Sequence, residues 1–287
     1  MRIRIGTVAG LLLILAMHAS AGIQFEYRQT THSDVEALGS SDVRARVTME
    51  GDRSRIEYLS GSIYPPGTYL ISMDGSRRML FVSPATKSYA EVDYSTIAQS
   101  LGANTGLTVT NLKSDMKTIA DTPRVYIAGF PTDHYRLEMT YDMTVVVVGV
   151  PLKQTVRTVI DKWTTTAFGD YAAALLEDGG LRTGHASLDA VIDAETTNIK
   201  GFPMRQIVEI STTMHSKSNP GSQLRVNPSR RQRTEMNVTS IRKTDVLTSL
   251  FEVPRHFQKL ERGEEAKKDK DGPVHILNME PSTDTDG

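Results

Sequence analysis

The side chains best placed to form a binding site are methionines and tyrosines on predicted strand faces. In residues 135–147 every second position is apolar or aromatic, so these side chains share one face. Thioethers are flexible and polarizable, and they line adaptable apolar cavities well. The pattern fits either an ordinary core between sheet and helix or a hollow for a hydrophobic ligand. The candidate ligand-binding residues are Tyr135, Met139, Tyr141, Met143, Met204, Met214, Met236, Leu175 and Leu176.

Sequence patterns for catalysis or metal binding are missing. The chain has no H-E-x-x-H, G-x-S-x-G, P-loop or G-x-G-x-x-G. Its histidines are scattered singly, and we interpret His134 with Asp133 as an ordinary surface pair on the polar side of a strand. Asp178-Gly179-Gly180 is more simply a helix stop than a calcium site. We therefore expect no catalytic residue, no metal and no cofactor.

Four arginines form a second group of interest. Arg225, Arg230, Arg231 and Arg233 fall in or beside a polar loop before a predicted strand at 232–243. Such a loop needs no partner, because arginines in a solvated loop are satisfied by water. The functional alternative is a docking patch for acidic headgroups or for a partner protein.

The elements that position these residues are mostly strands. Residues 43–92 form a ladder of short period-two segments bounded by Gly, Asp and Pro, which is typical of an antiparallel sheet with one wet face. The longest predicted hairpin joins 135–147 to 152–163, and strands of this length bend strongly or lie in a curved sheet. A further long strand is expected at 203–214.

Two segments interrupt the strands with helical patterns. Residues 168–178 contain a run of Ala and Leu that ends at Gly179-Gly180, and a second helix is expected over 187–198. We expect the first helix to plug the apolar side of the sheet. Leu175 and Leu176 would then be the residues that move away when a ligand enters.

The first 21 residues predict export. Arg2 and Arg4 precede a short apolar run, and Ala19-Ser20-Ala21 fits an A-x-A cleavage site, so the mature chain is expected to begin near Gly22 in the periplasm or outside the cell. The apolar run is too short to span a bilayer. With 0 cysteines the chain has no disulfide and no lipoprotein acyl acceptor, so its core must hold it together.

Charge and length limit the possible partners and the domain organisation. Without the two leader arginines the net charge is about −3, which argues against a nucleic-acid partner. The expected organisation is a signal peptide over 1–21, a single domain over 22–260, and a charged, disordered tail over 261–287.

A series of short segments follows one another in an order that is typical of one group of proteins. They are the strand at 43–49, Arg55-Ile56-Glu57, the segments 79–84 and 87–89, the segment 127–132, Asp161-Lys162-Trp163, the segment 200–203 and the segment 251–254. In this order they resemble exported proteins of the DUF4412 type, within the wider superfamily of the lipoprotein carrier LolA and the receptor LolB, and the match covers residues 23–258. The resemblance implies a mainly β (α+β) fold, with a strongly curved antiparallel sheet or incomplete barrel whose concave face is covered by short helices.

Two functions remain open at this point. In carriers of the group the hollow holds acyl chains, which favours a non-catalytic exported protein that binds a lipid acyl chain or a lipoprotein in a half-barrel hollow. The alternative is an envelope sensing or scaffold protein with a filled core, no ligand, and a protein partner bound at the sheet edge or the arginine loop. Neither function requires a membrane-spanning segment.

Overall fold

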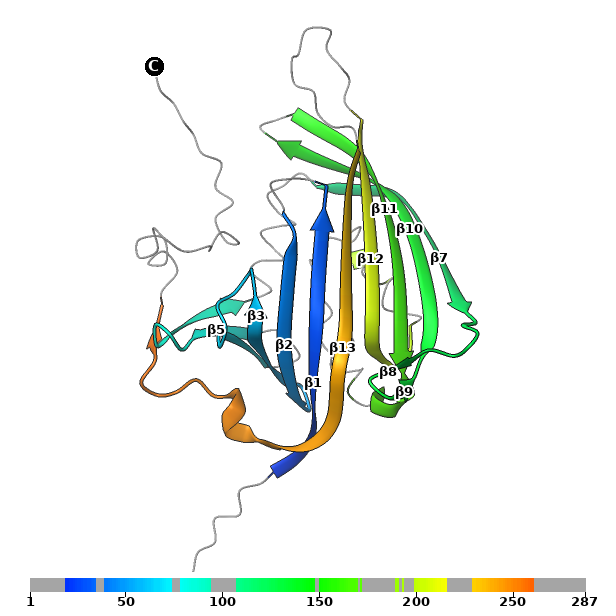
Figure 1. Ribbon diagram of the computed structural model, residues 1–287. Helices are drawn as coiled ribbons and strands as arrows, with labels where there is room; N and C mark the ends of the chain where they lie inside the picture. Colours follow the sequence, from blue (N-terminus) through cyan, green and yellow to red (C-terminus); the bar gives the residue numbers. More distant parts are fainter. Residues whose placement is uncertain are drawn as a thin grey trace, which may run out of the picture.

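The computed structural model describes residues 19–34, 39–73, 78–93, 107–147, 150–169, 171, 189–190, 193, 199–215 and 229–260. These ranges form a 12-stranded sheet in the order β14-β6-β5-β4-β3-β2-β1-β13-β12-β11-β10-β7, and a small sheet of β8 and β9 (Figure 1). Neighbouring strands are antiparallel except for β14 and β6, which are parallel. The prediction of a mainly β protein is confirmed.

The strands have the following bounds. They are β1 (Ala19–Ser33), β2 (Ser41–Glu50), β3 (Arg53–Gly61), β4 (Tyr69–Met73), β5 (Arg78–Ser83), β6 (Ser88–Asp93), β7 (Thr108–Ile119), β8 (Tyr126–Ile127), β9 (Phe130–Pro131), β10 (Asp133–Val147), β11 (Val150–Thr165), β12 (Phe202–His215), β13 (Ser229–Leu247) and β14 (Gln258–Lys259). Two 3-10 turns, η2 (Thr166–Phe168) and η3 (Thr248–Phe251), follow β11 and β13.

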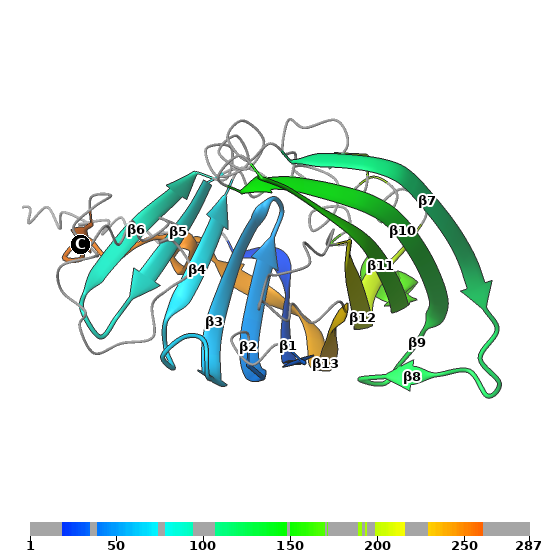
Figure 2. The ribbon, with the colours of Figure 1, turned by 90° about the horizontal axis from the view of Figure 1, so that it is seen from above.

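The long hairpin expected from the alternation is present as β10 and β11, and the strand expected at 203–214 is β12. The strand expected at 232–243 is longer in the structure, where β13 extends from Ser229 to Leu247. In Figure 2 the strands β7 and β10 bend along their length. Since β13 lies between β1 and β12, the sheet joins the beginning of the described chain to its end.

Alternate side chains of the strands point to opposite sides of the sheet. We call one side the apolar face, on which Phe25, Val47 and Ile160 lie, and the other the ion-pair face, on which Glu26 contacts Arg46. The main core cluster lies on the apolar face and is closed at one end by η2 and the β8–β9 hairpin. Its buried members are Ile23, Phe25, Val47, Met49, Phe168, Phe202, Met204 and Val238.

Over β4 and β5 the chain after β13 covers the ion-pair face. This segment, residues 248–259, is called the C-terminal strap. Phe251 is 3% exposed and packs among Tyr69, Ile71, Leu80 and Val82. Arg55 fixes the strap, because its guanidinium lies 3.6 Å from the Tyr69 ring centroid and donates to the carbonyl oxygen of Leu250 at 3.2 Å. Figure 1 shows the strap leaving the lower end of β13 and running toward β5.

Several predictions fall outside the described residues. They concern the leader before residue 19, most of both expected helices, and the charged tail after residue 260. Leu175, Leu176 and Arg225 are in these parts. Within the described ranges, no helix combines the length and hydropathy needed to cross a bilayer.

Candidate functional site

The strand register places the predicted ligand-binding residues in rows across the apolar face. Met143 lies opposite Gln154, and Gln154 lies opposite Met214 on the next strand. Tyr141 and Val156 form the adjacent row, followed by Met139 and Thr158. Because directly opposed residues of antiparallel strands project to the same side, these side chains share one surface of β10, β11 and β12.

Burial divides the predicted residues into two groups. Met139 and Met204 are 3% and 0% exposed and belong to the core. Met204 packs in the cluster with Phe168 and Phe202, at the end of the face that η2 closes. The others are half-buried, and they are Tyr135, Tyr141, Met143, Met214 and Met236.

Tyr141 illustrates the environment of the half-buried group. Burial raises the pKa of its phenol, and a hydrogen bond with Thr158 offsets part of that rise. A neutral phenol on an apolar surface presents a largely hydrophobic body with one polar tip. Tyr141 therefore adds mainly apolar surface to this face.

One row of this face contains a charged residue that sequence reasoning did not select. Lys162 is 5% exposed and lies between Tyr135 on β10 and Gln206 on β12. Gln206 in turn lies opposite Met236 on β13. The sequence did indicate that Lys162 points to this face, because Lys162 is two residues from Ile160 on the same strand and Ile160 belongs to the core.

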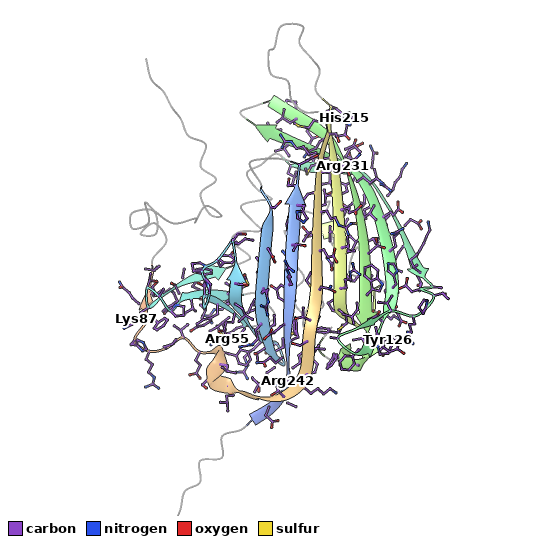
Figure 3. The ribbon with its side chains drawn as sticks, in the orientation of Figure 1. Arg55, Lys87, Tyr126, His215, Arg231 and Arg242 are labelled. Atoms are coloured by element: carbon purple, nitrogen blue, oxygen red, sulfur yellow. The ribbon has the colours of Figure 1, made fainter. Side chains whose placement is uncertain are left out.

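The arginine cluster has a different position from the one expected. Arg230, Arg231 and Arg233 lie in β13 and not in a loop. Arg231 and Arg230 lie opposite Ser211 and Thr212, so they project to opposite sides of the sheet. Figure 3 shows Arg231 at the upper end of β13. The three side chains therefore do not form one patch.

Arg233 is also occupied by neighbouring carboxylates. Its guanidinium forms ion pairs with Glu209 on β12 and with Glu235 two residues along its own strand. Arg205, next to Glu235, donates to the same carboxylate at 2.7 Å. This part of the ion-pair face is internally neutralised, which leaves less charge for an external partner.

The interpretation of His134 as a surface residue is wrong. Its side chain is buried, and its ring stacks on Trp163 with the centroids 4.0 Å apart. Asp133 instead pairs with Arg124 at 2.7 Å. The hairpin register explains the stacking, since His134 lies directly opposite Trp163.

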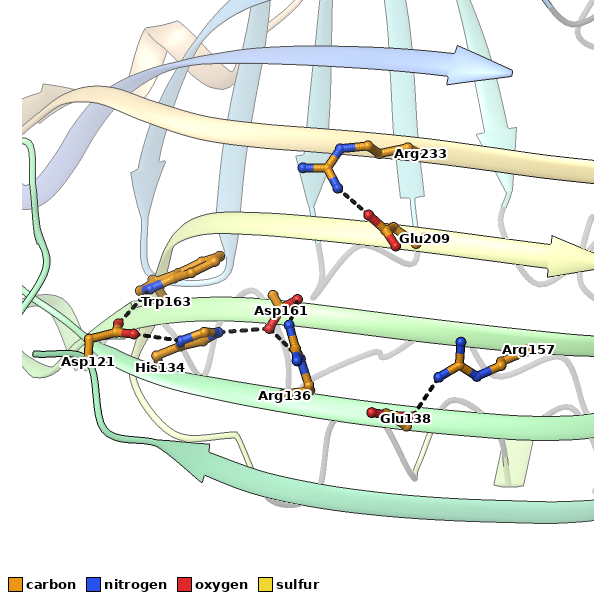
Figure 4. A network of polar contacts seen from close by, with 9 residues as sticks. All are labelled: Asp121, His134, Arg136, Glu138, Arg157, Asp161, Trp163, Glu209 and Arg233. Atoms are coloured by element: carbon orange, nitrogen blue, oxygen red, sulfur yellow. Dashed lines mark hydrogen bonds and ion pairs between the residues drawn. The ribbon is translucent and has the colours of Figure 1, made fainter. Parts of the chain in front are cut away.

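His134 is the centre of a network of polar contacts (Figure 4). Its Nδ1 atom lies 3.1 Å from Asp121, and its Nε2 atom lies 2.8 Å from Asp161. Arg136 donates two hydrogen bonds to Asp161, each of 2.9 Å. The indole nitrogen of Trp163 donates to Asp121 at 3.0 Å.

This network fixes the ring of His134 within the sheet. A carboxylate only accepts hydrogen bonds, so a ring nitrogen donates to Asp121 or Asp161 when that nitrogen carries a proton. Both ring nitrogens lie within hydrogen-bond distance of protein carboxylates, which positions the imidazole. Burial raises the pKa of Asp161, but hydrogen bonds from Arg136 and His134 outweigh burial and hold that pKa below its usual value.

Two further features of the described residues bear on chemistry. In these ranges no group of three or more His, Cys, Asp or Glu side chains is arranged to hold a metal ion. A hollow of about 260 Å³ lies where β7 and β10 are out of register, and its lining is polar and apolar in about equal parts. The lining residues are Asn111, Lys113, Thr140, Tyr141 and Asp142.

Comparison with known proteins gives distant structural likenesses. No protein-family model matches the sequence, and no curated protein matches it either. An uncharacterized conserved protein from Thermus thermophilus is similar in structure, with a TM-score of 0.34, 10% identity, and coverage of 83% of this chain and 91% of that one. A LolA superfamily protein from Nitrosomonas europaea gives 0.30 and 9%, with coverage of 80% and 90%. The resemblance to the DUF4412 type stays a prediction.

Proposed function

We propose that this protein is a non-catalytic binding protein that holds the acyl chain of a lipid or lipoprotein against the apolar face of its sheet. In this proposal the sheet is a strongly curved, incomplete barrel, and the binding surface is its concave side. The protein would work after export, in the periplasm or outside the cell, with cleavage near Ala21. The helices expected within 168–198 would cover the bound chain.

One observation carries the proposal. Tyr141, Met143 and Met214 lie in two adjacent rows of the apolar face, and all three are half-buried. Methionine side chains adapt their shape to irregular apolar partners, so such a surface accepts an acyl chain without fixed complementarity. The few polar contacts within it, such as that between Tyr141 and Thr158, are satisfied inside the protein.

A second observation favours the scaffold function. At the other end of the same face Phe202 and Met204 are 0% exposed, and the Phe168 and Phe130 rings meet at 4.9 Å. That end is filled by the protein itself. If the rest of the face is filled in the same way by the segments between η2 and β12, the protein would bind an envelope partner and no lipid.

The experiment is native mass spectrometry with lipid extraction on the mature protein, purified from its own exported fraction without detergent. An acyl-bearing species in one-to-one ratio supports the carrier function and identifies the ligand. The apo protein should then take up cis-parinaric acid, whose fluorescence rises in an apolar environment, and should be stabilised by it through linkage.

The opposite result would be protein that is free of lipid, fails to take up cis-parinaric acid, and has a melting temperature that added fatty acid does not change. That combination overturns the lipid proposal and leaves the scaffold function. Export is tested separately by N-terminal sequencing of the protein from the exported fraction, which should begin near Gly22.

A further inference from the structure

The strand β7 forms one edge of the 12-stranded sheet. It pairs with β10 on one side, and on the other side no strand of the described ranges pairs with it (Figure 2). An edge strand presents a row of backbone N–H and C=O groups that can pair with a strand of another chain. With its 12 residues, β7 is long enough to accept such a strand.

The chain closes the opposite edge of the sheet with its own strand β14. The amide nitrogen of Gln258 donates to the carbonyl oxygen of Lys87 at 2.9 Å. The amide nitrogen of Leu260 donates to the carbonyl oxygen of Tyr89 at 2.8 Å. These bonds hold β14 beside β6, so among the described strands β6 is covered and β7 is the edge at which a further chain would add.

The centre of β7 has apolar and charged side chains on separate faces. Leu112, Ser114 and Met116 share the apolar face, and Met116 packs against a core cluster of β10 and β11. Lys113 and Asp115 lie on the ion-pair face and are exposed. The segment 112–116 therefore lacks the inward-pointing charge with which many proteins block pairing at an edge.

The segment 112–116 is complementary to a second copy of itself. When two copies run antiparallel about a two-fold axis through Ser114, Lys113 of each copy faces Asp115 of the other. On the apolar face, Leu112 of each copy then faces Met116 of the other. Opposite charges and apolar side chains that face each other across two strands are stabilising, whereas like charges there are destabilising.

Other registers of the same orientation are less complementary. An axis through Lys113 or through Asp115 places that charge opposite its own copy, which is repulsive. An axis through Met116 pairs Asp115 with Lys117, but it places the ammonium of Lys113 opposite the apolar side chain of Ile119. The register centred on Ser114 is therefore favoured.

A β-bulge limits the length of this pairing. The register of β7 against β10 shifts between Thr140 and Asp142, and Asn111 has a φ of +56°. A bulge interrupts the regular ladder and increases the local twist, so regular pairing ends before Asn111. An interface of this length is small, which is typical of weak association that depends on concentration.

We propose that the protein forms a symmetric dimer in which two β7 edges pair antiparallel, with Ser114 on the two-fold axis and Lys113 paired with Asp115 across it. Such an interface is isologous, because the same segment of each copy contacts the other. The apolar faces of the two sheets then continue into each other through Leu112 and Met116. This inference does not depend on the proposed acyl-binding function, since it rests on the edge of the sheet alone.

The test is sedimentation velocity of the mature protein over a dilution series, in which the wild-type dimer should dissociate reversibly. Lys113→Glu places carboxylates opposite each other and Asp115→Lys places ammonium groups opposite each other, so each should weaken the dimer about tenfold or more. Lys153→Glu is the matched control. It makes the same change of charge at an exposed lysine of the interior strand β11, so it should leave the dimer unchanged.

Mixing the two β7 variants tests the register itself. Each supplies the charge that the other lacks, so an equal mixture of Lys113→Glu and Asp115→Lys should form a heterodimer with an affinity close to that of the wild type. Independently, Ser114→Cys places one thiol at the axis of a chain with 0 cysteines, and oxidation should link two copies. Thr213→Cys, which is exposed on the interior strand β12, should stay unlinked.

Each outcome has a defined meaning. A wild-type protein that is monomeric at every concentration overturns the interface and leaves the acyl-binding function untouched. A dimer that persists in both charge variants uses another surface, which also overturns the interface. A dimer that is lost in Asp115→Lys but kept in Lys113→Glu, or that mixing does not restore, overturns the register centred on Ser114. Should a charge variant not fold, the Ser114→Cys cross-link decides.

Discussion

His134 and Trp163 face each other across β10 and β11, and their rings stack at 4.0 Å with an interplanar angle of 19°. Arg205 lies on Trp163 as well, with its guanidinium carbon 4.9 Å from the ring centroid. The imidazole is thus held by stacking and by Asp121 and Asp161 at its two nitrogens. This arrangement makes His134 a structural residue of the sheet, with consequences that can be measured.

Replacing His134 with alanine should destabilise the protein by about 1–3 kcal/mol, because two buried hydrogen bonds to charged groups are lost along with the stacking. The measurement is urea-induced unfolding followed by tryptophan fluorescence, since Trp163 is the single tryptophan and lies in the network. Asp133→Ala is the control, because its exposed pair with Arg124 should contribute less than about 1 kcal/mol. Equal effects of the two substitutions would show that the buried network adds nothing.

The pH dependence of stability should report on Asp161. Its pKa is lowered in the folded protein, so its charged form contributes stability that is fully present above the unfolded-state pKa of about 4. That contribution disappears as the pH falls through the lower folded-state pKa. Asp161→Asn should therefore be less stable than the wild type at neutral pH, and the difference should shrink at acidic pH.

The Asp161 measurement is a series of urea unfolding curves for both proteins between neutral pH and about pH 3. Arg136→Gln provides a second reading, because removal of the guanidinium that donates to Asp161 should reduce the same acid-sensitive contribution. A difference between wild type and Asp161→Asn that stays constant over the series would contradict the assignment.

The sequence predicted the local parts of this site and missed the remote ones. The hairpin of β10 and β11 followed from period-two alternation on both sides of a turn, and its register alone places His134 opposite Trp163. Asp121 comes from the loop after β7, and Arg205 comes from β12. No local pattern indicates which loop or strand will lie beside a given face, so the burial of His134 could not be predicted.

The difference between local and remote contacts also explains why the C-terminal strap over β4 and β5 was not predicted. The alternation of Tyr69, Ile71, Leu80 and Val82 was readable as one apolar side of two strands. That the chain after β13 returns to cover it depends on Phe251, which lies far away in the sequence. The loop position expected for Arg230 and Arg231 was wrong for a related reason, because β13 begins three residues before the predicted start of the strand and includes both residues.

Phe251→Ala should be among the most destabilising single substitutions, by about 3–5 kcal/mol, because the ring is 3% exposed and fills the space under the C-terminal strap. The comparison is Leu247→Ala, whose side chain is 43% exposed and should change stability by about 0.5 kcal/mol or less. Both are measured by urea unfolding. A small effect of Phe251→Ala would mean that the strap contributes little to the stability of the sheet.

Gly201 should not tolerate alanine. Its φ is +90°, and a Cβ atom would lie 2.9 Å from the carbonyl oxygen of Thr165. Both the backbone conformation and the contact are unfavourable, so Gly201→Ala should cost about 1–3 kcal/mol. Gly169→Ala serves as the control, since its Cβ atom would meet nothing within 4 Å. Thermal unfolding of the two variants separates them, and an equal melting temperature would contradict the expectation.

Methionines on the apolar face should separate into those that hold the fold and those that bind the ligand. Met204 is 0% exposed, so Met204→Ala should lower stability by about 2–5 kcal/mol. Met143 and Met214 are half-buried and lie in the row of Gln154. Replacing either with glutamine keeps the length of the side chain and adds a polar amide to the acyl surface, so cis-parinaric acid should bind about tenfold more weakly while the melting temperature changes little.

The decisive comparison, in each methionine variant, is between the loss of affinity for cis-parinaric acid and the loss of stability. Fluorescence titration gives the affinity for cis-parinaric acid, and thermal unfolding without ligand gives the stability. If Met143→Gln and Met214→Gln lose stability as Met204→Ala does and leave probe binding unchanged, the whole face is core and the scaffold function is favoured. If they lose affinity alone, the half-buried rows are the surface on which the acyl chain lies, because only a ligand contact responds to polarity there without a change in folding.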